Sequence, residues 1–267
     1  MFNVSEAELS ILLVEPSAMQ LKVIMRQLQE AGVSKIDGVS DGAAALDLIK
    51  QYPPDLVISA MYLPDMTAAD LLLQIRADDK HAACNFMLIS SETDFNTLEP
   101  LRQAGVVAIL PKPFVADDLR RALRTTLDYL DPQELTLQNY DAANLKVLLV
   151  DDSLTARNHI GRVLKDLGIG YIAKAENGVD AVKLLQQTDF DLVVTDLNMP
   201  DMDGQALTQY IRGELGNSFM PILMVTSEQN QTRLGQVQQA GISALLDKPF
   251  EPQSIRETLY RVLDEAI

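Results

Sequence analysis

The segment Lys146-Val147-Leu148-Leu149-Val150-Asp151-Asp152 places two adjacent carboxylates directly after a short apolar run. The run is too short for a buried helix and rich in branched side chains, so it predicts a strand covered on both faces of a parallel sheet. Runs of the same kind occupy residues 192–195 and 222–226. Stretches with apolar residues at helical spacing separate or follow the runs, at residues 154–167, 179–187 and 255–263. Strand and helix therefore alternate along this half of the chain.

This alternation, repeated five times, predicts an α/β domain with a doubly wound, five-stranded parallel sheet and helices on both faces. It implies right-handed crossovers between the strands. In such sheets, ligands bind at the carboxyl ends of the strands, beside the point where the strand order reverses. The function of the domain is therefore expected to depend on the side chains that sit at its strand ends.

The same pattern is written twice in the chain. Leu12-Leu13-Val14-Glu15 matches residues 148–151, Pro111-Lys112-Pro113-Phe114 matches residues 247–250, and each match lies 136 positions further on. A repeat of this length is too long for a solenoid unit and predicts a duplicated whole domain. We therefore predict two domains in tandem, residues 8–130 and 145–267. Residues 131–144 are polar and begin with Asp-Pro, and we expect them to form a linker that is loose or that continues the preceding helix.

Polar side chains end or follow four strands of the second copy. The acidic pair Asp151 and Asp152 follows the first strand, Asp196 follows the third, Thr226 ends the fourth and Lys248 follows the fifth. Neighbouring carboxylates repel one another, so the cluster is costly unless a cation neutralises it. Oxygen ligands that cover an ion only in part suit Mg²⁺, which keeps several of its waters. The pattern predicts a magnesium site beside a nucleophilic carboxylate, a hydroxyl and an ammonium group.

A simpler interpretation is that each of these polar residues caps a helix. Asp152 or Ser153 could, for example, accept hydrogen bonds from the first turn of the helix that begins at Leu154. For any one residue the two interpretations are equally good. The combination of an acidic pair, a third acid, a hydroxyl and a lysine, each after a different strand, favours the chemical interpretation.

These residues make the second copy resemble the receiver domains of two-component response regulators, and closely so the single-domain, CheY-like regulators of chemotaxis. The resemblance implies a flavodoxin-like sheet, a phosphoacceptor at Asp196, a switch hydroxyl at Thr226 and a phosphoryl contact at Lys248. In this family the bond between Lys248 and Pro249 is typically cis. The copy departs from many relatives at Leu245, where they carry a switching aromatic residue, so their coupling between threonine and aromatic ring does not carry over.

The resemblance also assigns the metal site. It implies that Mg²⁺ is held by Asp152, Asp196 and the main-chain carbonyl of Asn198, with Asp151 acting through water. Asn198 and Glu228 occupy the positions that tune how fast water removes the phosphoryl group. Both match the chemotaxis regulators, which indicates a short-lived signal.

The first copy lacks most of this chemistry. Glu15, Pro16 and Ala60 stand at the positions of the acidic pair and the phosphoacceptor, whereas Ser90 and Lys112 keep the hydroxyl and the ammonium group. One carboxylate on a flexible stem is a poor magnesium site. We expect Lys112 to pair with Glu15, because a half-buried ammonium group without a partner is costly. The first copy is thus expected to be a degenerate pseudo-receiver that keeps its fold and acts in dimerisation or domain docking.

Composition limits the partners. The chain has 22 Lys and Arg against 38 Asp and Glu, a net charge of −16, which disfavours direct binding to nucleic acid or to anionic membranes. No apolar run approaches the length of a membrane span, and no signal peptide is readable at the N-terminus. The single cysteine provides no disulfide framework. We expect a cytoplasmic protein.

The favoured function is two-component signalling. A sensor histidine kinase or a histidine phosphotransfer protein would phosphorylate Asp196, and the signal would pass by contact with a downstream protein that the sequence does not identify. The chain would catalyse only its own phosphotransfer and dephosphorylation, and homodimer formation is left open.

Three alternatives remain. The chain could be a phosphate sink or relay intermediate, or the regulatory part of a longer protein with a separate output domain. The least favoured alternative is a phosphatase of the haloacid-dehalogenase type, which requires a second acid two residues after its nucleophile, where Asn198 stands.

Overall fold

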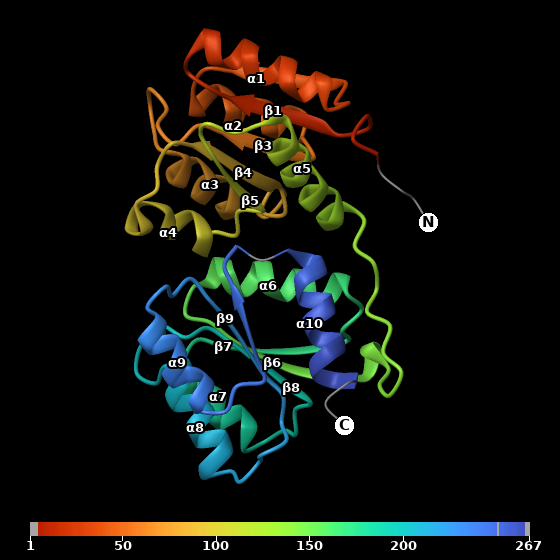
Figure 1. The fold of residues 1–267 in the computed structure, drawn as a ribbon, viewed down its shortest axis with the longest axis vertical. Helices are drawn as coiled ribbons and strands as arrows, with labels where there is room; N and C mark the ends of the chain where they lie inside the picture. Colours follow the sequence, from red (N-terminus) through yellow and green to blue (C-terminus); the bar gives the residue numbers. More distant parts are fainter. Residues whose placement is uncertain (1–4, 250, 265–267) are drawn as a thin grey trace. The chain divides into compact units, whose positions relative to one another are not determined.

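The computed structural model describes residues 5–249 and 251–264, and the end of the predicted second domain, residues 265–267, lies outside them. The chain divides into two compact units between Pro132 and Gln133, inside the predicted linker. Each unit is a five-stranded sheet with helices on both faces (Figure 1). The fold class predicted from the sequence, two doubly wound flavodoxin-like domains in tandem, is confirmed.

The first unit alternates strand and helix five times, and its parallel strands follow the order β2-β1-β3-β4-β5. Its elements are β1 (Ser10–Val14), α1 (Ala18–Glu30), β2 (Lys35–Val39), α2 (Gly42–Gln51), β3 (Leu56–Ser59), α3 (Ala68–Ala77), β4 (Asn85–Ser90), α4 (Phe95–Gln103), β5 (Ala108–Pro111) and α5 (Ala116–Leu130).

The second unit repeats this order, with parallel strands arranged β7-β6-β8-β9-β10. Its elements are the short 3-10 helix η1 (Ala142–Asn144), β6 (Lys146–Val150), α6 (Leu154–Asp166), β7 (Tyr171–Ala175), α7 (Gly178–Leu185), β8 (Leu192–Thr195), α8 (Gly204–Gly213), β9 (Ile222–Thr226), α9 (Gln231–Gln239), β10 (Ala244–Asp247) and α10 (Pro252–Asp264). The chain order reverses at β6, so β6 and β8 flank the point where such sheets bind ligands.

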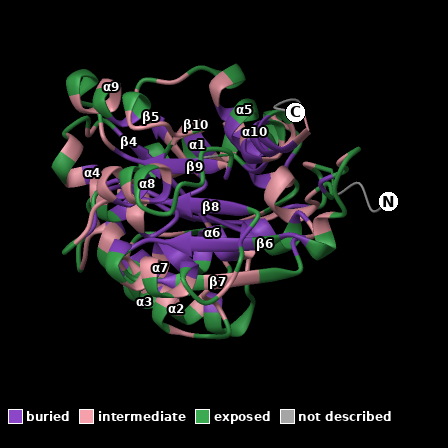
Figure 2. Cartoon of the chain, turned by 90° about the horizontal axis from the view of Figure 1, so that it is seen from below, coloured by how far each residue is buried: buried purple, intermediate pink, exposed green. Residues whose placement is uncertain are grey.

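The sheets are buried on two faces because successive strand residues point to opposite sides. On β1, Leu12 and Val14 pack into the core under α2, α3 and α4, whereas Ile11 and Leu13 pack into the core under α1 and α5. The central strands of the second unit, β6, β8 and β9, are almost entirely buried in the same way (purple in Figure 2). Among the residues described here, no helix is long and apolar enough to cross a membrane.

The linker does not continue α5, which ends at Leu130. From Gln133 onward it belongs to the second unit, where Leu135 is buried and its amide donates a 2.9 Å hydrogen bond to the carbonyl of Leu167. The amides of Gln138 and of the next residue donate to the two carboxylate oxygens of Asp264 on α10, at 2.6 and 3.0 Å. These contacts make residues 133–139 a packed strap on the second unit.

The strap is expected to stabilise the second unit chiefly through Leu135. Because this side chain is only 5% exposed, Leu135→Ala should lower the free energy of unfolding of that unit by about 2 kcal/mol, near the low end for buried leucines because the site can relax toward solvent. Urea denaturation of the full chain measures the change. Leu137→Ala is the matched control, since Leu137 is only half-buried, and equal effects of the two substitutions would contradict this account.

Candidate functional site

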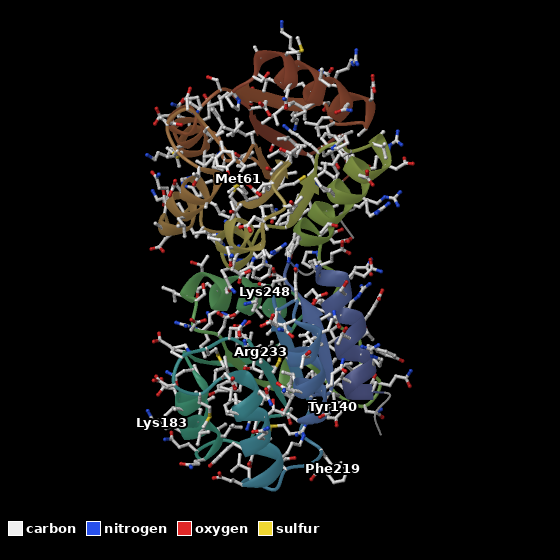
Figure 3. All side chains as sticks on the ribbon, turned by 60° about the vertical axis from the view of Figure 1, so that its left-hand side comes forward. Met61, Tyr140, Lys183, Phe219, Arg233 and Lys248 are labelled. Atoms are coloured by element: carbon white, nitrogen blue, oxygen red, sulfur yellow. The ribbon has the colours of Figure 1, made fainter. Side chains whose placement is uncertain are left out.

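Three charged side chains meet at the carboxyl edge of the second sheet. Lys248, labelled in Figure 3, places Nζ 2.8 Å from Asp151 Oδ2 and 3.2 Å from Asp196 Oδ1. The three residues are 5%, 0% and 2% exposed, respectively. They follow β10, β6 and β8, so only the folded sheet brings them together. The structure therefore places side by side the residues that the sequence analysis named as lysine contact, metal acid and phosphoacceptor.

Burial changes the acidity of the cluster. It raises the pKa of the Asp196 carboxyl to about 6, with Lys248 opposing the rise and Asp151 adding to it. Burial likewise raises the pKa of Asp151, against the attraction of Lys248. For Lys248 burial opposes the charge, but the two carboxylates together raise its pKa. The two carboxyl groups thus share one ammonium group, and burial leaves their charges poorly screened by solvent.

The residue that caps α6 is Ser153, whose Oγ accepts a hydrogen bond from Ala156 N. Asp152 is exposed and does not take that role. Asp151 Oδ1 accepts from Ser153 N at 2.9 Å, and Asp196 Oδ2 accepts from the amide two residues on at 3.0 Å. Capping therefore leaves the Asp152 side chain unexplained.

Of the remaining predicted residues, only Asn198 donates a hydrogen bond to the Asp196 side chain within the described part of the chain, through its amide. Thr226 is fully buried at the end of β9, and its Oγ1 accepts from Glu228 N at 3.1 Å. Glu228 Oε2 lies 3.1 Å from Arg233 on α9, which is labelled in Figure 3. Hydrogen bonds from the amides that follow it, and then Arg233, lower the pKa of Glu228. Within the described residues, no three His, Cys, Asp or Glu side chains are grouped closely enough to form a metal site by themselves.

The first unit carries a different arrangement at the same edge. Lys112 Nζ lies 3.1 Å from Glu15 Oε2, which confirms the predicted ion pair, and also donates to Gln20 Oε1. Ser90 Oγ accepts a 3.0 Å hydrogen bond from the amide of Glu92. Thr226 Oγ1 accepts in the same way from the amide of Glu228 in the second unit. These residues, together with Pro16 and Ala60, line a cavity of about 280 Å³. Lys112 pairs with one carboxylate here, whereas Lys248 lies within 3.2 Å of two in the second unit.

Comparison with known proteins identifies both units. The sequence model of the response regulator receiver domain matches residues 11–124 and 147–260. The chain belongs to the response regulator receiver family. Receiver domains are generally non-enzymatic modules of two-component signalling; they interact with histidine kinases or phosphotransfer proteins and typically bind Mg²⁺.

Individual receivers match about half of this chain. Chemotaxis protein CheY-3 of Vibrio cholerae serotype O1 is 36% identical over 121 residues, which are 45% of this chain and 93% of that protein. CheY of Pseudomonas aeruginosa is 36% identical over 120 residues, 45% of this chain and 97% of that protein. The solved structure of CheY4 of Vibrio cholerae has 35% identity and a TM-score of 0.42, and the match covers 45% of this chain and 98% of that one.

A match over nearly the whole chain also exists. A probable two-component system response regulator/GGDEF domain protein has 19% identity and a TM-score of 0.44, with 97% of this chain and 99% of that chain covered. Both receivers of this chain have a cis bond between the lysine and the proline that follow the last strand, as is typical of the family. The two bonds are Lys112-Pro113 and Lys248-Pro249.

Arg157 is a residue of the second receiver that the sequence analysis missed. Its buried guanidinium donates to the main-chain carbonyls of Asp151 and Asp152. A signal was available, because the corresponding residue of the first receiver is Leu21, 136 positions earlier. An arginine at an inward-facing helix position needs partners inside the domain.

Gly204 brings α8 against the main chain of Asp196. A Cβ atom at this position would overlap the main-chain oxygen of Asp196 and lie 3.1 Å from its carbonyl carbon. Gly204→Ala must therefore displace Asp196, and we expect phosphorylation by acetyl phosphate to slow at least tenfold, since small misplacements of a reacting group are costly. The initial rate of adduct formation, followed by intact-mass spectrometry, measures this effect. Gly213→Ala on the same helix has open space around its Cβ and should leave the rate unchanged; a Gly204→Ala rate equal to it would refute the argument.

Proposed function

We propose that the second receiver accepts a phosphoryl group on Asp196 from a phosphohistidine of a sensor histidine kinase or histidine phosphotransfer protein, in the cytoplasm and with Mg²⁺. The observation that carries the proposal is the buried cluster of Asp196, Asp151 and Lys248, with Lys248 within 3.2 Å of both carboxylates. A cluster with two acids for one base is electrostatically unfavourable as a purely structural device. It suits a site that acquires further positive charge when it works.

The chemistry follows from this geometry. A carboxylate oxygen of Asp196 attacks the phosphorus atom, the bond from phosphorus to the histidine nitrogen breaks, and the electron pair of that bond leaves with the imidazole, which takes up a proton. Lys248 offsets the charge on the phosphoryl oxygens. Because the pKa of Asp196 is about 6, the carboxylate is ionised and nucleophilic at neutral pH.

The donor set fits a hard cation. Asp196 Oδ1 is buried, and its neighbour within the described residues is Lys248 Nζ at 3.2 Å, so a lone pair of this oxygen remains for a ligand. The residues that would hold Mg²⁺ are Asp152, Asp196 and the carbonyl of Asn198, with Asp151 acting through water, and all of them offer oxygen. When bound, the ion would supply the positive charge that the cluster lacks.

A route from the site to a partner surface runs through Thr226. Its hydroxyl would hydrogen-bond the new phosphoryl group, and its present partner is the amide of Glu228, whose carboxylate is held by Arg233 on α9. Phosphorylation would shift a pre-existing equilibrium of the face built by α9, β10 and α10, to the extent that the two states differ in phosphoryl contacts. The output is contact with a downstream protein.

We propose that the first receiver is a degenerate adaptor that serves dimerisation or docking. Ala60 offers no nucleophile, and the ion pair of Glu15 with Lys112 fills the position of the metal acids. Exposed apolar side chains stand near this edge, with Met19 77% and Tyr62 60% exposed. Such side chains could contribute apolar contacts to a protein partner.

Intact-mass spectrometry after incubation with acetyl phosphate tests the proposal. With Mg²⁺ we expect one phosphoryl group per chain, and with EDTA we expect none. Two groups per chain would show that the first receiver is also an acceptor, and an adduct that is independent of Mg²⁺ would reject the mechanism.

A further inference from the structure

The acidic pair of the second receiver is held from behind by a buried arginine. Arg157, in the first turns of α6, is 5% exposed. Its Nη1 donates to the carbonyl of Asp151 at 2.6 Å and to the carbonyl of Asp152 at 3.1 Å, and its Nη2 donates to Glu176 Oε1 at 2.8 Å. We infer that Arg157 is a positioning residue that sets the direction of the Asp152 side chain. This inference rests on the function proposed above.

The two carbonyls belong to the two peptide planes that flank the Cα atom of Asp152. Each plane is rigid, so the backbone at this residue can change only through its φ and ψ angles. A guanidinium group is planar and presents its donors in a fixed fork, and donation to both carbonyls therefore restrains both angles. The direction of the bond from Cα to Cβ follows from them. Arg157 thus aims a carboxylate that it does not touch.

Asp152 needs this restraint because its side chain has no other. It is exposed, and within the described part of the chain its carboxylate makes no hydrogen bond or ion pair. Asp151 differs, since its carboxylate is fixed by Ser153 N and by Lys248. A flexible carboxylate loses conformational freedom when it binds a cation, and a fixed backbone lowers that cost.

The first receiver separates a role in the site from a role in the fold. Leu21 stands there in place of Arg157, and Ser40 in place of Glu176. Leu21 packs against the core beneath α1 and α5, and the unit keeps its five-stranded sheet. The fold therefore does not require the arginine. It is absent from the copy in which Pro16 has replaced the acid that we infer it to position.

Isothermal titration of the full chain with MgCl₂ tests the inference without phosphorylation. We expect Arg157→Leu to weaken Mg²⁺ binding by roughly tenfold or more, the range found when groups that orient metal ligands are removed. Arg157→Lys should recover part of the loss, since an ammonium group can donate to a carbonyl without the fork. Glu176→Ala, which removes only the surface anchor of the guanidinium, should weaken binding by about threefold. At saturating Mg²⁺ the rate of phosphorylation by acetyl phosphate should return toward that of the wild type.

Arg162→Leu is the matched control, because it removes the same charge from the same helix and should leave the affinity within twofold. Thermal unfolding in EDTA establishes that the variants are folded. If folded Arg157→Leu binds Mg²⁺ as tightly as the wild type, the inference is overturned. If that variant does not fold, Glu176→Ala decides, and an unchanged affinity overturns the inference as well. If the wild type itself binds no Mg²⁺, the proposed function fails first.

Discussion

The Asp196→Asn chain is expected to gain no phosphoryl group from acetyl phosphate under conditions in which the wild type gains one. Asparagine keeps the shape of the side chain and can still accept from the amide of Asn198, which lies 3.0 Å from Asp196 Oδ2. It has no anionic oxygen to attack phosphorus. The expected effect is therefore loss of the adduct in the intact-mass spectrum rather than a slower reaction.

Asp201→Asn is the control for this experiment. Asp201 lies in the loop that follows Asp196, is exposed, and has a φ of 64°, a conformation that asparagine adopts readily. The substitution removes one carboxylate near the site with little strain, so the adduct should form as in the wild type. An adduct that survives Asp196→Asn would place the acceptor elsewhere, and one lost equally in Asp201→Asn would point to a general charge effect.

Asp196→Asn is also expected to stabilise the second receiver in the absence of metal. The folded state raises the pKa of the Asp196 carboxyl from 3.8 to about 6, so between these values the folded chain binds more protons than the unfolded chain. Stability consequently falls as the pH rises through this window, and the cost is complete above it. At about 1.4 kcal/mol per pKa unit, the penalty at neutral pH is about 3 kcal/mol. Asparagine resembles the protonated acid and escapes it.

Urea denaturation in EDTA measures this gain. We expect Asp196→Asn to raise the free energy of unfolding by up to about 3 kcal/mol at pH 7.5 and to have little effect near pH 4. The transition to follow is the one that Leu135→Ala shifts, because Leu135 packs on the second unit. A gain that is equally large at both pH values would show that the effect does not come from ionisation of Asp196.

Much of the fold was predictable because its signals are local. The run 146–150 and the helix that begins at Leu154 were predicted from branched apolar residues and helical spacing, and the structure has both. The meeting of Asp151, Asp196 and Lys248 was also predictable, since parallel strands end at one edge. The repeat made these predictions firmer, because each element could be recognised twice.

What the sequence analysis missed depends on contacts between distant segments. The hydrogen bond from Gln138 to Asp264 joins residues 126 positions apart, and no periodic pattern in the sequence predicts such a contact. Arg157 was missed for another reason, since an arginine in a helix is ordinarily solvated and only its partners reveal a buried role. The roles assigned to Thr226 and Glu228 by resemblance stay predictions.

The replacement of two acids by one at the edge of the first receiver bears on how the two copies can diverge. Ala60 has no carboxyl group, so the first receiver lacks the cost that we expect ionisation of the buried Asp196 to impose on the second, and its Glu15 pairs with Lys112. Proteins tolerate new substitutions in proportion to the stability they hold above the threshold for folding. If the proposed function holds, the first receiver therefore has more stability to spare for new substitutions than the second.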